Sequence, residues 1–419
     1  MLSYIELCAG LGGTRLGLQR LGWRCLFACD TDSSAAAGHR RAFGDCNEMD
    51  VEDIGSANIP SYDVLVAGFP CQPFSSSGNR LGFNHRKGNV FSFIEEFLLK
   101  TNPRFVLFEN VRGMLSNRGG HSMASVLKAL TDAGYYAEWC VINSLSYQIP
   151  QDRQRLFILA TRVSSNSNSN PFWRSTIRSM TPSVGSMFFH SLLSGSCKLI
   201  GTAREGVLSQ ILKETEPQVG RSLVGKSMPF SRYGQAFRDR FITTEIAHSS
   251  SRSYHMSLGE ICCPGLDEQE AVRSVRFWGH SGTTRPYSKV LPVSHCIGTN
   301  IGAGPTFCVP ISKIKGPSQE REVLKYANWS RKQDGSLIFR LTPERALLLF
   351  DKKPTALAEG LAGSGAGITK QYELIGNMVV PCVAQAVGGC LESIANQKEG
   401  ELVSHFQSKE GSEGSGINS

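Results

Sequence analysis

Residues 3–30 of the chain read SYIELCAGLGGTRLGLQRLGWRCLFACD. A short apolar run at 4–7 leads into a glycine-rich turn, and apolar side chains with helical spacing follow over residues 15–21. A second apolar run, 23–29, ends at Asp30. A strand, a glycine turn, a helix and a second strand in this order are typical of an α/β protein whose parallel strands form one sheet.

The same alternation continues over the first 160 residues. We expect further strands at 62–67, 105–108 and 156–160, and helices at 91–99 and 123–130. Strands separated by helix-length segments predict a doubly wound, mostly parallel sheet with helices on both faces. Ligands bind such sheets at the carboxyl ends of the strands, so residues that follow a strand are the first candidates for a site.

The composition of the chain suggests four parts. Between Arg162 and Pro171 lies the polar, low-complexity run SSNSNSN, which we interpret as a domain boundary or a flexible loop. Thr342 and Pro343 form a strong helix start, with Thr342 as the N-cap. We therefore expect a first domain over 1–162, a second domain over 163–340, a helical return to the first domain over 341–395 and a disordered tail over 396–419.

The overall composition is that of a globular protein. The 419 residues are 41% hydrophobic and 19% charged, which supports a substantial core. Thirteen cysteines without a CxxC pair or a Cys/His pair at zinc-finger spacing argue against a disulfide scaffold and give no support to a metal site. We expect a soluble protein, because the sequence has neither a signal-peptide pattern nor eighteen uninterrupted apolar residues.

The net charge of +8 is distributed unevenly along the chain. Residues 1–160 carry 15 basic and 15 acidic side chains, residues 161–350 carry 24 and 13, and residues 351–419 carry 5 and 8. A neutral part beside a strongly basic one suggests a reaction centre next to a surface that binds a polyanion. A basic surface that only interacts with water is the alternative.

The glycine-rich turn ELCAGLGG, residues 6–13, favours a cofactor that contains a nucleoside. Glycines let a ligand approach the backbone, and the helix N-terminus that follows favours a negative group. The spacing is not GxGxxG, because Arg15 stands where the third glycine would be. Asp30, at the end of the next strand, suits a pair of ribose hydroxyls. A purely structural glycine turn is the alternative.

Two other predicted strands are followed by residues that could carry chemistry. In GFPCQPFS, residues 68–75, the thiol of Cys71 lies between two prolines that fix the backbone, which suits a nucleophile; a buried packing cysteine is the alternative. In FENV, residues 108–111, Glu109 beside an apolar run could have a raised pKa and hold a proton for donation; a helix-capping acid is the alternative.

Two basic segments complete the set of candidates. In QDRQR, residues 151–155, Arg153 and Arg155 would share one face of an extended segment and could grip a phosphate or a carboxylate, or form a solvated pair. The polar, basic stretch 75–89 suits a mobile loop that closes over a bound polyanion.

Taken together, these segments resemble the DNA (cytosine-5)-methyltransferase family. The matching segments, in order, are ELCAGLGG, GFPCQPFSSSG, FENVRGM, NSLSYQIPQDRQRLF, RLTPERALLLF and QYELIGNMVVP, and they cover 1–162 and 286–395. The resemblance implies a Rossmann-like class I methyltransferase fold that uses S-adenosylmethionine. It also implies a second, smaller target-recognition domain over 163–340, in which residues 279–288 loosely resemble a loop that enters the duplex.

The resemblance further implies the chemistry of the site. Cys71 as a thiolate would add to carbon 6 of a cytosine, which makes carbon 5 nucleophilic enough to accept a methyl group. Glu109 would contact ring nitrogen 3 and the exocyclic amine and supply a proton. Arg153 and Arg155 would hold the base carbonyl and position the catalytic groups. Because carbon 6 is unreachable in a stacked duplex, the base would flip out, with residues 75–89 as the clamp.

The resemblance assigns binding residues as well. For the cofactor these are Cys8, Gly10, Leu11, Gly12, Gly13, Asp30, Thr31, Asp50, Pro70 and Asn377. For the DNA they are Gln72, Ser75, Ser77, Arg80 and Arg285, while basic side chains of the middle region would bind phosphates. The chain departs from the family at Cys8, where Phe is common, at Thr31, where a bulky residue is common, and at Met378, where Ser is usual. These departures bear on cofactor affinity.

We therefore expect a monomeric enzyme without a metal that methylates double-stranded DNA in the cytoplasm of a prokaryote, or that is encoded by a phage. An RNA cytosine-5 methyltransferase acting on transfer RNA is the nearest alternative on the same fold. A nicotinamide-dependent oxidoreductase would explain the glycine turn but leaves Cys71, Glu109 and the two arginines without a shared purpose. A binding module that has lost activity is disfavoured, because all principal catalytic residues are present.

Overall fold

The computed structural model describes two main stretches of the chain and several short segments between them. The described residues are 1–70, 90–163, 188–189, 197–215, 228–248, 276–278, 284–285, 294–295, 306–309, 327–331 and 337–396. Between 276 and 340 the description is limited to the backbone of short strands. The tail expected beyond residue 396 lies outside the described residues.

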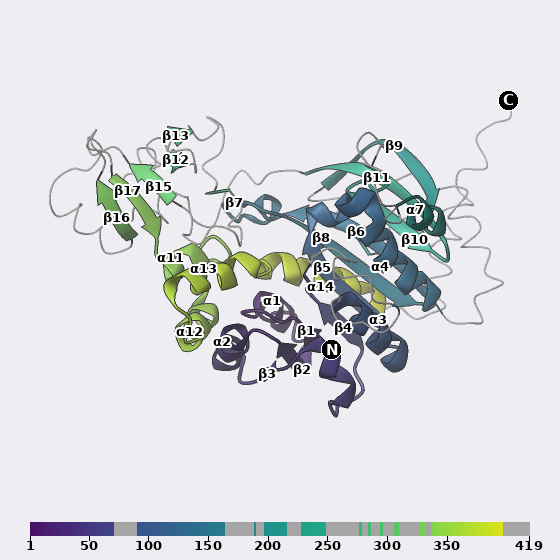
Figure 1. The fold of residues 1–419 in the computed structure, drawn as a ribbon, viewed down its shortest axis with the longest axis horizontal. Coiled ribbons are helices and arrows are strands. Elements are labelled where there is room, and N and C mark those ends of the chain that lie inside the picture. Colours follow the sequence, from purple (N-terminus) through teal and green to yellow (C-terminus); the bar gives the residue numbers. More distant parts are fainter. Residues whose placement is uncertain are drawn as a thin grey trace, which may run out of the picture.

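A ten-stranded sheet forms the centre of the molecule, with the order β3-β2-β1-β4-β5-β8-β6-β10-β11-β9 (Figure 1). The first five strands in this order are parallel: β3 (Asn47–Glu48), β2 (Arg24–Asp30), β1 (Ser3–Leu7), β4 (Val64–Ala67) and β5 (Phe105–Val111). The remaining pairings are antiparallel and involve β8 (Gln154–Arg162), β6 (Tyr135–Asn143), β10 (Tyr233–Phe237), β11 (Arg240–His248) and β9 (Cys197–Val207).

Both faces of the parallel strands are buried. Val64 and Leu107 lie in one apolar cluster, whereas their chain neighbours Leu65 and Phe108 lie in a second one. Successive side chains of a strand point to opposite faces of the sheet, so a strand covered on both faces needs apolar residues at every position. This is the physical reason for the continuous apolar runs in the sequence.

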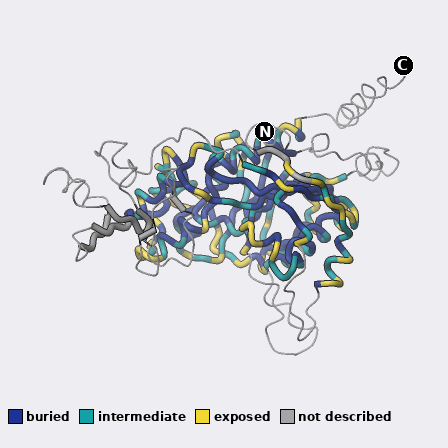
Figure 2. The backbone as a smooth tube through the Cα atoms, turned by 90° about the horizontal axis from the view of Figure 1, so that it is seen from above, coloured by how far each residue is buried: buried dark blue, intermediate teal, exposed yellow. Residues whose placement is uncertain are grey.

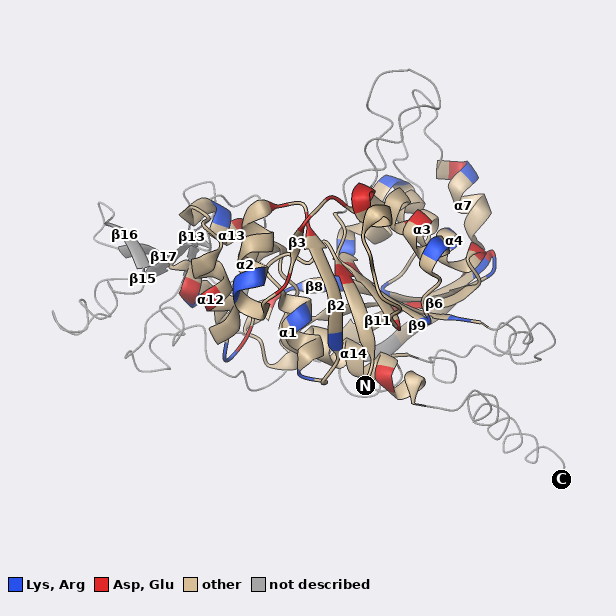
Figure 3. Cartoon of the chain, turned by 90° about the horizontal axis from the view of Figure 1, so that it is seen from below, with Lys and Arg blue, Asp and Glu red and all other residues tan. Residues whose placement is uncertain are grey.

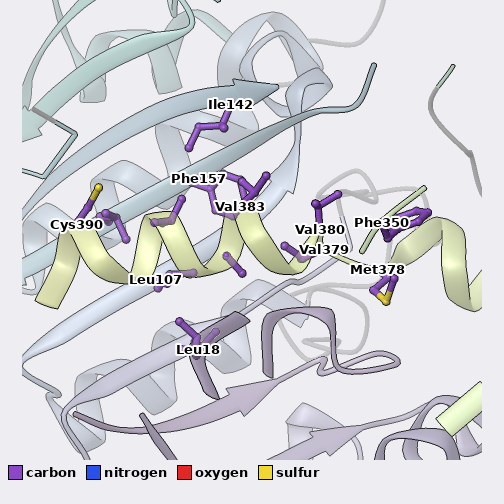
Figure 4. Close-up of a cluster of buried hydrophobic side chains, with 14 of the residues drawn as sticks. Leu18, Leu107, Ile142, Phe157, Phe350, Met378, Val379, Val380, Val383 and Cys390 are labelled. Atoms are coloured by element: carbon purple, nitrogen blue, oxygen red, sulfur yellow. The ribbon is translucent and has the colours of Figure 1, made fainter. Parts of the chain in front are cut away.

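Helices cover the two faces, as the sequence pattern predicts. On one face, α1 (Gly13–Gln19) and α14 (Pro381–Ala395) contribute to the first cluster, and Figure 4 shows Val383 of α14 among Leu18, Ile142 and Phe157. On the other face, α3 (Val90–Thr101) and α4 (His121–Asp132) contribute to the second cluster. α2 (Ser33–Phe43) follows β2 and lies against the C-terminal region.

The sheet is mixed, whereas the sequence pattern predicts a mostly parallel one. The difference begins at β8, which pairs antiparallel with β5. It continues at β6, a strand that the pattern misses: all nine residues are buried, but Glu138 interrupts the apolar run. The buried carboxyl of Glu138 accepts hydrogen bonds from Tyr136 Oη (2.6 Å) and Phe188 N (3.2 Å), which offset the cost of burying it. β6 in turn pairs antiparallel with β8, so β8 runs opposite to both of its neighbours in the sheet.

The large sheet also continues beyond the domain boundary expected at residue 162. β10 pairs with β6, and β11 and β9 extend the sheet to its edge. Gly234 of β10 allows this pairing to be close, because an added Cβ would lie 2.2 Å from the ring of Trp139. The strands β9, β10 and β11, which follow residue 163 in the sequence, therefore belong to the large sheet, and α7 (Leu208–Thr215) packs against α4.

A second, smaller sheet lies between residues 276 and 341. Figure 1 shows it at one end of the molecule, away from the large sheet. Its antiparallel strands, in spatial order, are β13 (Thr284–Arg285), β12 (Arg276–Trp278), β15 (Thr306–Val309), β17 (Leu337–Leu341) and β16 (Ala327–Arg331). A short parallel pairing of β14 (Ser294–His295) with β7 (Gln151–Asp152) connects this region to the segment that precedes β8.

The C-terminal helices return the chain to the large sheet. α11 (Pro343–Leu347) starts as predicted, because Thr342 Oγ1 accepts a hydrogen bond from Arg345 N (3.4 Å). α12 (Thr355–Gly363) and α13 (Ile368–Asn377) lead into α14. By length and composition alone, Ile368–Ala395 could cross a membrane, but 72% of its most apolar window is buried, as in a core helix. Figure 2 shows buried residues running through the centre of the described chain.

Candidate active site

Four of the predicted site segments meet at one edge of the large sheet. β1, β2, β4 and β5 run parallel, so their carboxyl ends lie at the same edge. Figure 3 shows β2 with basic and acidic residues at its ends, and Asp30 is at the carboxyl end. The glycine-rich turn follows β1, Gly68 follows β4, and Glu109 lies near the end of β5. This is the edge at which α/β proteins bind ligands.

The glycine-rich turn has an open side at Gly10. Cys8 (φ 54°), Gly10 (φ 56°) and Gly12 (φ 94°) all adopt the left-handed region, which glycine enters freely and a residue with a side chain rarely does. A Cβ added at Gly10 would meet no atom of the described residues within 4 Å. The backbone at Gly10 therefore borders a space that a ligand could fill.

The other side of the turn faces the protein. Leu11 is fully buried, and a Cβ added at Gly12 would lie 2.2 Å from the ring of Phe43. At Gly13 it would lie 2.1 Å from the carbonyl oxygen of Val379. These three predicted cofactor residues shape the turn, and a contact from them to a ligand would use backbone atoms.

Asp30 is held directly beneath this turn. Its Oδ2 accepts a hydrogen bond from Gly10 N (2.8 Å), and its Oδ1 accepts one from Asp32 N (2.9 Å). Burial raises the pKa of Asp30, and the two backbone hydrogen bonds partly oppose this shift. Each carboxylate oxygen can accept a further hydrogen bond. A carboxylate fixed beside an open glycine turn could accept hydrogen bonds from a pair of ligand hydroxyls.

The remaining cofactor candidates differ in exposure. Four of them have exposed side chains: Thr31, Asp50, Pro70 and Asn377. Asp50 caps the 3₁₀ helix η1 (Val51–Ser56), because its Oδ1 accepts a hydrogen bond from Glu52 N (3.0 Å). Cys8 is half-buried, and burial holds the pKa of its thiol well above the usual value. The Cys8 side chain is therefore neutral at physiological pH.

Glu109 presents a carboxyl group suited to binding a ligand. Its Oε1 lies 3.3 Å from Arg155 Nε and has no hydrogen-bond partner among the described residues. A Cβ added at Gly68 would lie 3.6 Å from Glu109 Oε2, so the acid borders the segment that follows β4. Burial raises the pKa of Glu109, although Arg155 and Arg153 oppose the shift. The raised pKa agrees with the prediction from its sequence position.

Asn110 is a functional candidate that the sequence reasoning did not single out. Its side chain is buried, and its Nδ2 donates a hydrogen bond to the carbonyl oxygen of Phe69 (2.9 Å). Its Oδ1 accepts a hydrogen bond from Val111 N (2.9 Å). Asn110 thus fixes the backbone just before Pro70. The only sequence signal was its place next to Glu109 in the ENV segment.

The two arginines of the QDRQR segment have different partners. Arg155 lies on β8 opposite Val111 of β5 and beside Glu109. Arg153 lies between β7 and β8, and its Nη2 donates hydrogen bonds to the carbonyl oxygens of Gly376 (2.8 Å) and Met378 (2.7 Å). The charges of both arginines oppose the rise in the pKa of Glu109, but these two hydrogen bonds of Arg153 are made to the C-terminal region.

Several predicted site residues lie outside the described residues. They are Cys71, Gln72, Ser75, Ser77 and Arg80, together with the rest of the 75–89 stretch. Arg285 lies on β13, of which the backbone alone is described. Within the described parts of the chain, no group of three His, Cys, Asp or Glu side chains is arranged to hold a metal ion.

The family model for C-5 cytosine-specific DNA methylases matches residues 2–249, which is more than half of the chain. The chain belongs to this family. The matched range contains the glycine-rich turn, Glu109 and Arg155, and it ends one residue after β11. A methylase match that includes β9, β10 and β11 agrees with their place in the large sheet.

Known methylases resemble part of the chain. The Type II methyltransferase M.DsaV of Dactylococcopsis salina is 32% identical over 167 residues, which are 40% of this chain and 48% of that protein. The Type II methyltransferase M.HhaI of Haemophilus parahaemolyticus is 34% identical over 171 residues, 41% of this chain and 52% of that protein. The chain spans about half the length of the curated relatives it matches.

The fold of the chain is shared with a solved structure. The crystal structure of the S. pombe Dnmt2 methyltransferase has a TM-score of 0.51 and 15% sequence identity, and the alignment covers 95% of this chain and 100% of that one. At this identity the likeness concerns the fold alone. It confirms the predicted α/β, Rossmann-like methyltransferase class.

Proposed function

We propose that this methylase transfers a methyl group from S-adenosylmethionine to carbon 5 of a cytosine flipped out of a specific duplex DNA sequence. The observation that carries the proposal is Glu109, a buried carboxyl with a raised pKa whose Oε1 has no hydrogen-bond partner among the described residues and lies 3.3 Å from Arg155. The open turn at Gly10 lies at the same edge of the sheet. A base and a nucleoside cofactor would therefore bind side by side.

Residues of the sheet edge would hold the cofactor. Gly10 would contact it through the open side of the turn, Asp30 through the ribose hydroxyls and Asp50 through the adenine, while Asn377 would lie near the methionine part. The fixed carboxylate of Asp30 and the space over Gly10 support this assignment. Bound S-adenosylmethionine would supply an electrophilic methyl group. The other proposed contacts are Cys8, Leu11, Gly12, Gly13, Thr31 and Pro70.

Glu109 and Arg155 would bind the target base. A protonated carboxyl can donate a hydrogen bond to ring nitrogen 3, and its other oxygen can accept one from the exocyclic amine. A proton held at nitrogen 3 withdraws electron density from the ring and stabilises negative charge that develops during addition at carbon 6. The Arg155 guanidinium, beside the acid, would hold the base carbonyl.

Cys71 would be the nucleophile. Its thiolate would form a bond to carbon 6, and the electron pair of the 5,6 double bond would become available at carbon 5. After methylation, loss of the proton on carbon 5 and cleavage of the sulfur–carbon bond would restore the ring. The hydrogen bond from Asn110 to the backbone of Phe69, two residues before Cys71, supports a fixed approach to this position.

Duplex DNA would be the partner. The net charge of +11 over residues 161–350 supports phosphate binding by the middle of the chain, and flipping would make carbon 6 accessible. The proposed contacts are Gln72, Ser75, Ser77, Arg80 and Arg285. We further propose that the protein acts without a metal, as a monomer, in the cytoplasm of a prokaryotic cell and beside a restriction enzyme.

Methyl transfer from labelled S-adenosylmethionine tests the covalent mechanism. We expect Cys71→Ala and Cys71→Ser to fall to background, because neither side chain provides a thiolate, whereas Cys382→Ser on α14 should keep wild-type turnover. Turnover in either Cys71 variant would contradict the mechanism. Offering duplex DNA and transfer RNA in competition tests the substrate, and label in the RNA alone would favour the RNA methyltransferase.

A further inference from the structure

Arg153 is buried in the connection between β7 and β8, with 1% of its surface exposed. Its Nη2 donates hydrogen bonds to the carbonyl oxygens of Gly376 (2.8 Å) and Met378 (2.7 Å). The guanidinium also lies over the ring of Phe350, 5.1 Å from the ring centroid. An arginine Nη2 carries two hydrogens, so these two bonds use both of them.

The two carbonyl groups belong to the end of α13. This helix ends at Asn377, and Met378 is its C-cap. The last carbonyls of a helix have no partner within the helix, and a cation there satisfies them and interacts favourably with the helix dipole. The hydrogen bonds from Arg153 lie on both sides of Asn377 in the sequence. Arg153 therefore fixes the backbone that carries this exposed side chain.

The turn at 376–378 also packs against the beginning of α1. A Cβ added at Gly13 would lie 2.1 Å from the carbonyl oxygen of Val379 and 2.5 Å from Met378 Cγ. Such close packing leaves little room for the turn to shift without moving Gly13 and the open side at Gly10. The geometry of both chain segments at the proposed cofactor site therefore depends on where Arg153 holds this turn.

The QDRQR segment thus connects two parts of the site. Gln151 is buried, and its Nε2 donates a hydrogen bond to the carbonyl oxygen of Leu349 (3.4 Å), a second link to the C-terminal region. Two residues after Arg153, Arg155 lies beside Glu109. One arginine holds the C-terminal region, and the other lies beside the buried acid.

We infer that Arg153 is a positioning residue for cofactor binding, whereas Arg155 is the arginine that acts at the target base. The inference rests on the proposed function, in which Asn377 and the glycine-rich turn hold S-adenosylmethionine. It replaces the shared role that the family resemblance implies for the two arginines. Loss of the Arg153 side chain would leave two carbonyl groups without their charged donor, while the pair of Arg155 and Glu109 would remain.

The test compares binding with catalysis. The Kd for S-adenosylhomocysteine, the demethylated cofactor, is measured by calorimetry without DNA for wild type, Arg153→Met, Arg153→Lys and Arg155→Lys. We expect Arg153→Met to raise Kd at least about tenfold and Arg153→Lys to raise it less, because lysine keeps the charge but not the fork. Arg155→Lys should change Kd by less than about twofold and instead lower kcat at saturating cofactor.

A control separates positioning from general stability. Phe241→Leu, in the buried core at β11, should lower Tm without changing Kd, because the folded protein still binds normally. If Arg153→Met fails to fold, the Kd of Arg153→Lys for S-adenosylhomocysteine tests the inference. Wild-type affinity in Arg153→Lys would overturn the inference. So would a rise of Kd in Phe241→Leu that is as large as the rise in the Arg153 variants at the same loss of Tm. Absence of binding by the wild type would contradict the proposed function, and the inference with it.

Discussion

Glu109 shows how one side chain can connect local burial with chemistry. Burial raises the pKa of its carboxyl, even though Arg155 lies 3.3 Å away and Arg153 adds a second positive charge. A carboxyl that keeps its proton to higher pH can donate a hydrogen bond under conditions in which an exposed glutamate cannot. The proposed role therefore depends on protonation.

The substitution Glu109→Gln keeps the shape of the side chain but removes its acidic proton. We expect kcat for methyl transfer to fall by about 10²–10⁴-fold, the usual contribution of a positioned acid. The wild-type rate should also decrease as pH rises past the raised pKa of Glu109, because the deprotonated form cannot donate. Glu95→Gln on α3 alters another carboxyl whose pKa burial raises and should leave kcat unchanged. A wild-type rate in Glu109→Gln would refute the role.

Glu6 is a buried acid outside the proposed chemistry that should make stability depend on pH. Burial raises its pKa to about 8, although Arg15 and a hydrogen bond with Thr14 oppose the shift. Between about pH 4.5 and 8 the folded protein holds a proton that the unfolded chain has released. The free energy of unfolding should therefore fall as pH rises through this range, by on the order of 1 kcal/mol per pH unit at most.

Glu6→Gln should remove this dependence, because the amide stays neutral at every pH. The pH dependence of the free energy of unfolding is measured by urea unfolding at pH 5.5 and 8.5. The proteins compared are the wild type, Glu6→Gln and the exposed control Glu359→Gln. Stability that falls with pH equally in all three proteins would show that Glu6 is not the cause.

At the scale of elements, α1 and α14 approach so closely that glycine is required between them. A Cβ added at Gly17 of α1 would lie 2.3 Å from the carbonyl oxygen of Pro381 and 2.7 Å from Ala384 Cβ. At Gly389 of α14 it would meet nothing within 4 Å in the part of the chain that the structure describes. The backbone at Pro381 cannot rotate away as a side chain could, so the contact at Gly17 must move the helices apart.

The two glycines therefore form a matched pair. We expect Gly17→Ala to destabilise the protein by about 1–3 kcal/mol through overpacking. Gly389→Ala should stabilise it by about 0.5–1 kcal/mol, because alanine favours a helix interior. Urea unfolding of both variants measures these changes in the free energy of unfolding. Similar effects of the same sign would mean that α1 and α14 do not pack as described.

The sequence predicted the parallel half of the sheet better than the antiparallel half. β1, β4 and β5 lie where apolar runs predicted them, because strands buried on both faces need apolar residues throughout. β10 and β11 contain buried polar residues, and their hydrogen bonds are made within the fold: Gln235 Nε2 donates to Tyr233 Oη (2.7 Å), and Thr243 Oγ1 donates to Tyr233 O (2.8 Å). Apolar periodicity cannot reveal such strands.

The same limit applies to the site. Asp30 and Glu109 could be singled out because each comes at or near the end of a predicted strand. The partners of Arg153, at Gly376 and Met378, are more than two hundred residues away in the sequence. No local spacing contains that contact, so the different environments of the two arginines became visible only in the folded chain.

At the scale of the whole molecule, the basic middle region and the nearly neutral first part suggest different tasks. Residues 161–350 carry a net charge of +11, and the second sheet lies at one end of the molecule (Figure 1). Phosphate contacts release counterions, so DNA affinity should decrease steeply with salt.

We expect the affinity of the wild type for duplex DNA to fall at least about tenfold between 50 and 200 mM salt. We expect Arg285→Ala to reduce the slope of the logarithm of the DNA association constant against the logarithm of the salt concentration by about 1. Fluorescence anisotropy over a salt series measures both, with the exposed Arg41→Ala on α2 as a matched charge control that keeps the wild-type slope. Affinity that does not change with salt would contradict phosphate binding by the basic region.

The most direct test of the central claim is incubation of the protein with labelled S-adenosylmethionine and unmethylated genomic DNA, followed by bisulfite sequencing of the product. The account predicts 5-methylcytosine confined to one short sequence motif. Unlabelled DNA, with cytosines converted throughout, would contradict it.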